Sequence, residues 1–423
     1  MAEFIIHGGR RLSGHHKPPG NKNAALPMLV ACVLTDEPVR LQNLPLIDDV
    51  HTMLGLLEEI GVSVHLRGHT VDLCARGLRT TRLDAALCGK VRSSILFAGA
   101  LAARHGKAVL YPPGGDVIGR RRLDTHFESL KQLGITVRTN HHYSFAASKL
   151  HGARIVMDEA SVTATENTVM AAVLAKGVTT IFNAACEPHV RDLCLMLNQM
   201  GAMISGVGTN SLRIEGVGSL HGVTHKISPD YIDAAGFIAA AALTGGSITV
   251  EAAKEDDLFM VSRPFAKLGV RWTTTKGVLR MSPCRCLAVK EDFGSAIPKI
   301  EDGPWPSFPS DLMSAALVLA TQASGTMLFF EKMFESRMYF VDRLIEMGAR
   351  IVQCDPHRVL VSGPAKLHGT RLSSPDIRAG MALLLAALCA KGETVIGNAE
   401  VIDRGYESIE LRLRALGADI VRS

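Results

Sequence analysis

The sequence predicts an α/β fold built from six repeated units, three in each of two domains. A short phrase recurs six times, in which a helical stretch ends in Leu-Gly, Met-Gly or Ile-Gly and a β-type run follows. Ala-rich helical stretches also alternate with β-type runs, which is typical of α/β architectures. The chain has 423 residues, more than one ordinary core holds, so two domains are expected.

The six phrases lie about 67 to 79 residues apart, and such a period indicates a repeated structural unit. Glycine at the end of a helix can adopt the left-handed conformation that other residues resist. Each phrase therefore predicts a helix, a cap and a strand. The glycines concerned are Gly61, Gly134, Gly201, Gly269, Gly348 and Gly417.

A second, Ala-rich helix precedes several of these phrases. Residues 170–177, 239–243 and 379–391 show it, and a turn and a β-type run follow each time. Each unit is thus predicted to run helix, strand, helix, strand, with further β segments closing it. The Ala-rich helices are expected to pack between sheets.

Two proline-containing breaks interrupt the repeat, at residues 17–20 and 227–230. Proline and glycine there indicate turns or hinges. We expect one domain over residues 20–229 and a second formed by residues 1–19 with residues 230–423. The β-type run at the N-terminus is expected to cross to the later units, giving two connections between halves that close like a clam.

Composition is that of a soluble globular protein, with 47% hydrophobic and 21% charged residues. The net charge of +5 without a long basic run favours small anionic substrates over nucleic acid. The nine scattered cysteines contain no CxxC pair, so buried free thiols in a reducing compartment are expected, and neither a metal nor a cofactor. No signal-peptide pattern or membrane-length apolar stretch is seen, so a cytoplasmic protein without a membrane partner is expected.

The segment that fits the repeat least is a glycine-flanked loop at residues 112–126. It carries Gly114, Gly115 and Asp116, and then the cations Arg120, Arg121 and Arg122. Glycines allow a hinged lid and close approach of the backbone to a ligand, and arginine suits phosphate or carboxylate. A surface turn with solvated charges is the alternative.

Two other segments of the first half could bind anions. Lys22 and Asn23 open a helix, where backbone N–H groups already attract negative charge, although a solvated cap is the alternative. Residues 159–167 are rich in Ser and Thr before a helix and read equally well as helix capping, with Glu166 in the first turn.

In the second half, Asp311 stands just before an Ala-rich helix, where an N-cap is the simpler interpretation. Arg378 matches Arg92 at the start of such a helix, and Arg404 lies near the C-terminus. Each arginine alone is more often a solvated charge. Together, arginines and aspartates at helix starts in both halves could converge on one strongly anionic substrate pair.

These segments together resemble the enolpyruvyl transferases, and among them most closely the family that acts on UDP-N-acetylglucosamine. Five motifs match in order and spacing over essentially the whole chain, at residues 22–27, 114–121, 164–167, 308–311 and 403–407. The resemblance implies two inside-out α/β barrel domains of three units each. It also implies transfer of the enolpyruvyl group of phosphoenolpyruvate to the sugar 3′-hydroxyl, with release of phosphate, in peptidoglycan precursor synthesis.

The resemblance further assigns roles, since such a transfer needs a general acid and a general base. Asp116 occupies the position of the acid on the lid loop, and Asp311 that of the base. Lys22, Arg121 and Arg404 match the phosphate clamp, with Asn23 beside it and Arg378 near the carboxylate. The nucleotide-sugar site is matched by Arg92, Arg121, Arg122, Leu123, Asp124, Thr125, Glu159, Ala160, Ser161, Val162 and Met333.

The chain departs from the family pattern at several of these positions. Asp116 stands where cysteine is usual, so the acid must be a carboxyl group kept protonated by a raised pKa. Arg122 replaces a usual Pro and Thr163 a usual Gly beside the nucleotide site. Asn21 replaces a usual Ala, and Gly14-His15-His16 stands where Gly-Glu-Val is usual.

Two alternatives follow from these departures. One keeps phosphoenolpyruvate and changes the acceptor, for example to UMP in secondary metabolism. The other is a catalytically silent paralogue that binds a nucleotide sugar. The joint presence of Lys22, Asp311, Arg378 and Arg404 argues against silence, because binding alone does not need all four.

Overall fold

A computed structural model describes residues 2–116, 118–252, 254–284 and 286–423. Val117, inside the predicted Gly-Gly-Asp loop, lies outside the described residues, as do Met1, Ala253 and Arg285. The chain divides into two compact units by its contacts. Residues 20–116 and 121–228 form the N-terminal unit, and residues 2–19, 118–120 and 229–423 form the C-terminal unit.

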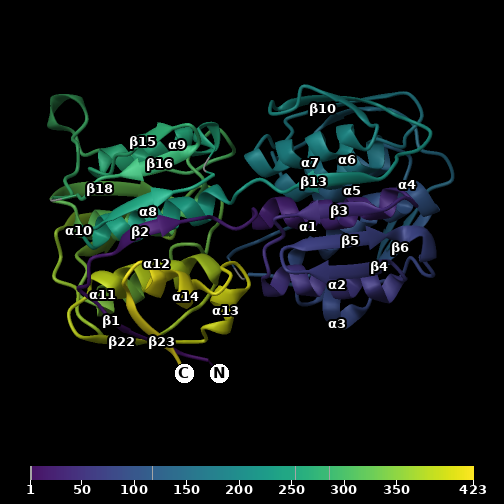
Figure 1. The fold of residues 1–423 in the computed structure, drawn as a ribbon. Coiled ribbons are helices and arrows are strands. Elements are labelled where there is room, and N and C mark those ends of the chain that lie inside the picture. The colour runs from purple at the N-terminus through teal and green to yellow at the C-terminus, as the bar shows by residue number, and fades with distance from the viewer. Residues whose placement is uncertain (1, 117, 253, 285) are drawn as a thin grey trace. The chain divides into compact units, whose positions relative to one another are not determined.

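Each unit has three Ala-rich helices at its centre (Figure 1). In the N-terminal unit they are α1 (Lys22–Ala31), α4 (Phe97–His105) and α6 (Val162–Ala172). In the C-terminal unit they are α8 (Tyr231–Leu243), α10 (Met313–Gln322) and α12 (Ile377–Cys389). They are buried almost all round, because small side chains let the helices pack closely on one another and on the sheets. The helices are therefore inside and the sheets outside, which confirms the inside-out α/β fold.

Three small sheets surround the central helices of each unit. Those of the N-terminal unit have the orders β13-β3-β5-β4, β6-β8-β7 and β11-β12-β10-β9. Their strands are β3 (Val39–Gln42), β4 (Ser63–Arg67), β5 (Thr70–Cys74), β6 (Lys107–Leu110), β7 (Thr136–Thr139), β8 (Tyr143–Ala146), β9 (Arg154–Val156), β10 (Val178–Phe182), β11 (Met203–Ser205), β12 (Ser211–Glu215) and β13 (Val223–Lys226).

The C-terminal unit has the orders β15-β16-β14-β2, β17-β18-β20-β19 and β21-β22-β1-β23. Its strands are β1 (Phe4–His7), β2 (Ser13–His16), β14 (Ser247–Val250), β15 (Thr273–Thr275), β16 (Val278–Met281), β17 (Lys299–Glu301), β18 (Gly325–Phe330), β19 (Ile351–Gln353), β20 (Arg358–Gly363), β21 (Arg371–Ser373), β22 (Glu393–Gly397) and β23 (Asp419–Arg422).

A second set of helices precedes the six predicted glycines. It comprises α2 (Asp48–Ile60), α5 (Asp124–Gln132), α7 (Pro188–Gln199), α9 (Glu255–Lys267), α11 (Val341–Glu346) and α14 (Ile409–Ala415). All six glycines have a positive φ, between 86° and 105°, and a strand begins within a few residues. The left-handed caps are thereby confirmed. The remaining helices are short: η1 (Cys32–Leu34), η2 (Ala75–Gly77), α3 (Ala85–Cys88), η3 (Arg92–Leu96), η4 (Phe293–Ser295), η5 (Ser310–Leu312) and α13 (Glu400–Asp403).

The repeats are joined by strands that pass to a neighbouring sheet. The strand after each central helix pairs in parallel with a strand from elsewhere in the same unit: β9 with β10, β13 with β3, β17 with β18, β21 with β22 and β2 with β14. For β6 this partner is reduced to a single bridge between Arg82 and Val109. Each sheet therefore depends on two segments of the chain, which makes each unit one cooperative body.

The N-terminal strand joins the later units, as predicted. β1 lies between β22 and β23 and is antiparallel to both, with Phe4 opposite Ile396 and Arg422 (Figure 1). β2 ends at His16, whose Nε2 lies 2.7 Å from Oδ1 of the buried Asp233. Arg412 donates to the other oxygen of this carboxylate at 2.6 Å. The atypical His16 thus fastens β2 to α8.

The nine cysteines are all free, but they are not all buried as expected. Cys32, Cys88 and Cys194 are buried, whereas Cys286 and Cys354 are exposed. The expectation of burial is therefore right for the first three only: Cys286 and Cys354 lie in loops at the surface, and four others are half-buried, Cys74, Cys186, Cys284 and Cys389. In the described part of the chain, no helix combines the length and apolar character that crossing a bilayer requires.

Candidate active site

Lys22 is the first residue of α1 and is buried rather than solvated. Asn21 caps the helix, since its side chain accepts a hydrogen bond from the Ala24 N–H at 3.0 Å. Lys22 Nζ lies 2.8 Å from Oδ2 of Asp49, and both side chains are about one-tenth exposed. Asn23 follows on the helix and is half-buried. The solvated-cap alternative is therefore wrong for Lys22, and its partner Asp49 is a residue that the sequence reading missed.

Arg92 begins η3, directly before the central helix α4, and binds the backbone of the arginine-rich segment. Its guanidinium donates to the carbonyl oxygens of Arg121, at 2.5 Å, and of Arg122, at 3.2 Å. Burial and the nearby Arg121 lower the pKa of Arg92 to about 10. The structure thus brings two of the predicted nucleotide-site arginines together and leaves a strongly positive segment in the N-terminal unit.

The three consecutive arginines have different environments. Arg120 and Arg122 are exposed, and Arg122 pairs with Asp124, while Arg121 is half-buried. The side chains of Arg120 and Arg122 therefore reach the surface, whereas that of Arg121 is partly covered by the protein. Leu123 is buried beside them.

The predicted residues of α5 and α6 meet at the starts of the two helices. Thr125 Oγ1 lies 3.4 Å from Oε1 of Glu159. Ser161 caps α6, because its Oγ accepts from the Ala164 N–H at 3.4 Å. Ala160 and Val162 flank it and are half-buried. The capping interpretation is thus correct for Ser161. As at any helix start, the first N–H groups of α6 have no partner within the helix.

Glu166 does not cap α6, contrary to the alternative interpretation. It is 1% exposed, and burial, followed by repulsion from Glu187, raises its pKa well above the ordinary value. It lies a full turn inside the helix, among central helices that leave no water to solvate a charge.

Asp116 lies at the end of the Gly-Gly segment and is half-buried. Gly114 N–H donates to the Cys88 carbonyl at 3.0 Å, and Gly115 has a φ of 110°, which favours glycine. Past Val117, the Ile118 carbonyl accepts from the Ser336 N–H at 3.1 Å, and the Arg120 N–H donates to Glu335 at 3.1 Å. The loop is thus held by backbone hydrogen bonds on either side of Asp116.

Asp311 is held between two buried arginines in the C-terminal unit. Arg378 donates to Oδ2 at 2.7 Å and Arg337 donates to Oδ1 at 3.1 Å. The two arginines are 5% and 4% exposed. Asp311 caps neither η5 nor α10, so the N-cap alternative is wrong. Charge-assisted bonds to both oxygens fix the orientation of the carboxylate, and Arg337 is a second residue that the sequence reading missed.

Arg378 stands in the first turn of α12, which Asp376 caps through the Arg378 and Ala379 N–H groups. It also donates to the Tyr406 hydroxyl at 2.9 Å. Burial opposes its charge, but Asp311, Tyr406 and Asp230 together outweigh burial and hold the pKa of Arg378 well above its usual value. Arg378 is therefore a permanent buried cation.

The last two predicted residues of the C-terminal unit lie nearer its surface. Arg404 follows α13 and is half-buried, and it is one residue before the Gly405-Tyr406 pair. Met333 is exposed, and its backbone N–H donates to Glu331 at 3.2 Å.

Behind Asp311 lies a buried carboxyl pair, Glu331 and Asp302, that the sequence reading also missed. The two side chains are 0% and 1% exposed. Ser310, the neighbour of Asp311, donates to Glu331 at 3.0 Å. Burial, followed by a hydrogen bond and repulsion from Asp302, raises the pKa of Glu331 to about 9. One carboxyl of the pair therefore keeps its proton near neutral pH.

The buried proton predicts how stability depends on pH. The folded-state pKa of Glu331, about 9, lies above the ordinary 4.5, so the folded protein holds a proton that the unfolded chain releases. This contribution to stability is complete below about pH 4.5 and is lost as the pH rises toward 9. In Glu331→Gln, the unfolding free energy should therefore fall less steeply with pH than in the wild type, by up to about 1.4 kcal/mol per pH unit.

Denaturant titrations between pH 5 and pH 9 measure this difference. The matched control is Glu346→Gln, which removes an exposed glutamate that pairs with Arg343. We expect the control to keep the wild-type slope. Equal slopes for Glu331→Gln and the wild type would mean that Glu331 is ionised in the folded protein.

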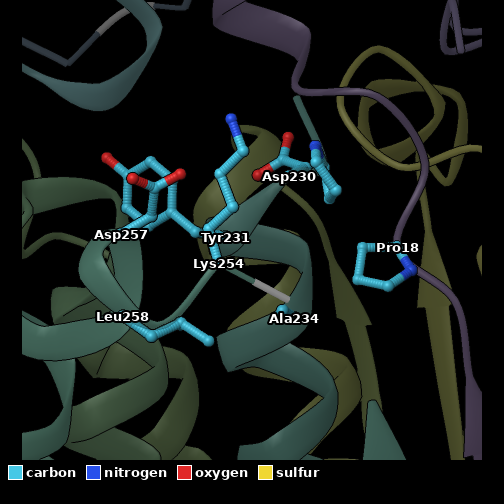
Figure 2. A pocket seen from close by; sticks show the side chains of 8 residues that line it. Pro18, Asp230, Tyr231, Ala234, Lys254, Asp257 and Leu258 are labelled. Carbon is cyan, nitrogen blue, oxygen red and sulfur yellow. The ribbon is translucent and has the colours of Figure 1, made fainter. Parts of the chain in front are cut away.

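The C-terminal unit also contains a small pocket beside the start of α8 (Figure 2). Pro18, Asp230, Tyr231, Lys254 and Asp257 are among its lining residues, which leave almost no room between them. None of the predicted substrate residues lines it. We assign it no substrate role.

Comparison with known proteins agrees with the fold. A family model described as EPSP synthase (3-phosphoshikimate 1-carboxyvinyltransferase) matches residues 6–413. The chain is 52% identical over 421 residues to a UDP-N-acetylglucosamine 1-carboxyvinyltransferase of Treponema denticola, and 53% identical over 421 residues to that of Treponema pallidum. Each alignment covers 99% of both chains.

Solved structures share the architecture. The enolpyruvyl transferase NikO from Streptomyces tendae superposes with a TM-score of 0.89 at 26% identity, covering 100% of this chain and 99% of that one. An EPSP synthase from Acinetobacter baumannii has a TM-score of 0.78 at 18% identity, with both chains covered completely, which is a likeness of fold. The chain therefore belongs to the EPSP synthase family of 1-carboxyvinyltransferases, and within it to the group of relatives named UDP-N-acetylglucosamine 1-carboxyvinyltransferase.

Proposed function

We propose that the protein transfers the enolpyruvyl group of phosphoenolpyruvate to the 3′-hydroxyl of UDP-N-acetylglucosamine and releases phosphate, a step of peptidoglycan precursor synthesis. The observation that carries this proposal is the identity of 52% and 53% to relatives with this named activity, over nearly the whole of each chain. The free cysteines suit a reducing compartment, which supports a cytoplasmic location.

The chemistry requires one proton to be taken and one to be given. The acceptor oxygen attacks C2 of phosphoenolpyruvate while its proton passes to a base, and C3 gains a proton from an acid, which gives a tetrahedral adduct. Loss of a proton from C3 and cleavage of the C2–O bond to phosphate then restore the double bond. Positioned acids and bases typically accelerate such steps by about 10² to 10⁴.

We assign the base to Asp311 and the acid to Asp116. The arrangement around Asp311 supports its role, because Arg337 and Arg378 fix both oxygens of the carboxylate and the group is not used to cap a helix. Asp116 lies on a glycine-flanked loop, as a proton donor on a lid would.

The cations are assigned to the negative charges of the substrates. Lys22, Arg121 and Arg404 would bind the transferred phosphate, with Asn23 beside them, and Arg378 would bind near the carboxylate of phosphoenolpyruvate. Cations placed around the transferred group stabilise the charge that develops on phosphate, and Lys22 is in addition buried at a helix start. Arg92, Arg122 to Thr125, Glu159 to Val162 and Met333 are the proposed nucleotide-sugar residues.

Phosphate release with a panel of acceptors tests the proposal. We expect release from phosphoenolpyruvate with UDP-N-acetylglucosamine, and release at least about a hundredfold slower with UMP or shikimate 3-phosphate, because each lacks groups that the site is built to bind. Faster release with UMP would assign the protein to another acceptor. Binding of the nucleotide sugar without release would make it a silent paralogue.

A further inference from the structure

Thr163 stands at the start of α6 and belongs to a chain of hydrogen bonds that ends in the backbone of another helix. Its Oγ1 lies 3.1 Å from Nε2 of His126. Nδ1 of the same ring lies 3.1 Å from the side-chain amide nitrogen of Asn167. His126 is 2% exposed and Asn167 is 0% exposed. Water therefore does not compete for these bonds, and each atom needs a definite donor or acceptor role.

The orientation of Asn167 is fixed by two backbone groups of the η3–α4 junction. Its Oδ1 accepts from the Gly99 N–H at 2.7 Å, and its Nδ2 donates to the Ile95 carbonyl at 3.0 Å. If the amide were flipped, its nitrogen would face the Gly99 N–H and its oxygen would face the Ile95 carbonyl, so neither hydrogen bond could form. The Asn167 side chain can come this close only because residue 99 is glycine, since a Cβ there would lie 2.5 Å from Oδ1 of Asn167. The second Nδ2 proton therefore points to His126.

This proton sets the tautomer of His126. Because Nδ1 accepts from Asn167, a neutral ring carries its own proton on Nε2. Burial, followed by repulsion from Arg92, lowers the pKa of His126 to about 3, so the ring is neutral near physiological pH. Nε2–H must then donate to Thr163, whose oxygen is the acceptor in this bond.

The hydroxyl proton of Thr163 is thereby left to donate elsewhere. Among the residues that the structure describes, no group accepts it, unlike the proton of Thr168 on the same helix, which binds the Ala164 carbonyl at 2.7 Å. Thr163 is half-buried and directly follows Val162, the last of the proposed nucleotide-sugar residues on this segment. Arg92 lies close enough to lower the pKa of His126, so a cation stands near this segment.

We propose that the Thr163 hydroxyl donates a hydrogen bond to a phosphate oxygen of the nucleotide-sugar acceptor, with His126 and Asn167 as the positioning residues that aim it. This rests on the proposed function, because it assumes an anionic acceptor beside residues 159–162. Thr163 then adds a side-chain donor that glycine, the usual residue in the resembling family, does not have.

Thr163→Val tests the inference, because valine keeps the shape of threonine and removes the hydroxyl. We expect the KM for UDP-N-acetylglucosamine to rise about tenfold or more, since a hydrogen bond to a charged group is lost. The KM for phosphoenolpyruvate should change less than about twofold. Thr163→Ser should restore most of the affinity. Calorimetry with UDP-N-acetylglucosamine alone checks the same effect without turnover.

Thr168→Val is the matched control, because its hydroxyl binds the backbone of the same helix, and it should leave the acceptor KM unchanged. An unchanged acceptor KM in Thr163→Val, or tighter binding by Thr163→Gly, would overturn the inference while wild-type turnover still supported the function. A ¹⁵N NMR spectrum should show His126 neutral with its proton on Nε2. A proton on Nδ1 would also overturn it. No binding or turnover of UDP-N-acetylglucosamine by the wild type would instead refute the proposed function.

Discussion

Asp311→Asn is expected to lower kcat for phosphate release by about 10² to 10⁴, because asparagine cannot take the proton of the attacking hydroxyl. The KM values should change far less, since asparagine has nearly the same shape and can still accept a hydrogen bond from Arg378. Steady-state phosphate release with both substrates varied separates the two effects. This is the largest loss that we expect from a single substitution.

Folding must be checked in the same variant, because Asp311 is the carboxylate partner of two buried guanidinium groups. Removing it leaves their charge less compensated, which costs stability. Thermal unfolding therefore accompanies the kinetics, and activity is measured well below the midpoint. Asp355→Asn is the matched control, since Asp355 also accepts from an arginine, Arg358, at 2.7 Å but is at the surface of the same unit. A kcat for Asp311→Asn within about threefold of the wild type would exclude Asp311 as the base.

Local rules account for what the sequence predicted of the fold. The conformation of a glycine after a helix is decided by its own missing Cβ, so Gly61 and its five counterparts could be recognised from the sequence and all have a positive φ. The N-terminal β-type run was likewise predicted to join the later units, where β1 pairs with β22 and β23. The same kind of reasoning predicted that arginines stand at the starts of helices, as Arg92 and Arg378 do.

Pairing between distant side chains could not be predicted, because packing of the whole unit decides it. Asp311 before a helix is a plausible N-cap by local pattern, and only the position of Arg337 and Arg378 shows that it has another partner. The buried ammonium group of Lys22 likewise pairs with Asp49, which belongs to another helix, α2. The raised pKa of Glu331 depends first on burial and then on Asp302, which follows a different strand. No signal within any one of these segments indicates such contacts.

Fosfomycin is expected not to inactivate this enzyme with time, because the loop position that it alkylates in the resembling family carries Asp116 in place of cysteine. A thiolate is a far stronger nucleophile toward an epoxide than a carboxylate is. The thiol of Cys88, whose carbonyl binds the loop at Gly114, does not replace it, because Cys88 is buried and burial raises the pKa of its thiol. Preincubation with the drug, dilution and measurement of phosphate release test this.

The variant Asp116→Cys tests whether resistance comes from the missing thiol at residue 116 alone or from a site that excludes the drug. If only the missing thiol protects the enzyme, this variant should keep measurable turnover, because cysteine can also donate a proton, and should lose that turnover progressively in the drug. Peptide mass spectrometry should place the adduct on residue 116, while the exposed Cys286 and Cys354 serve as internal controls for nonspecific alkylation. Time-dependent inactivation of the wild type would show that a second nucleophile reacts. Resistance of Asp116→Cys would show instead that the site excludes the drug, and protection would then come from its shape and charge and not from Asp116.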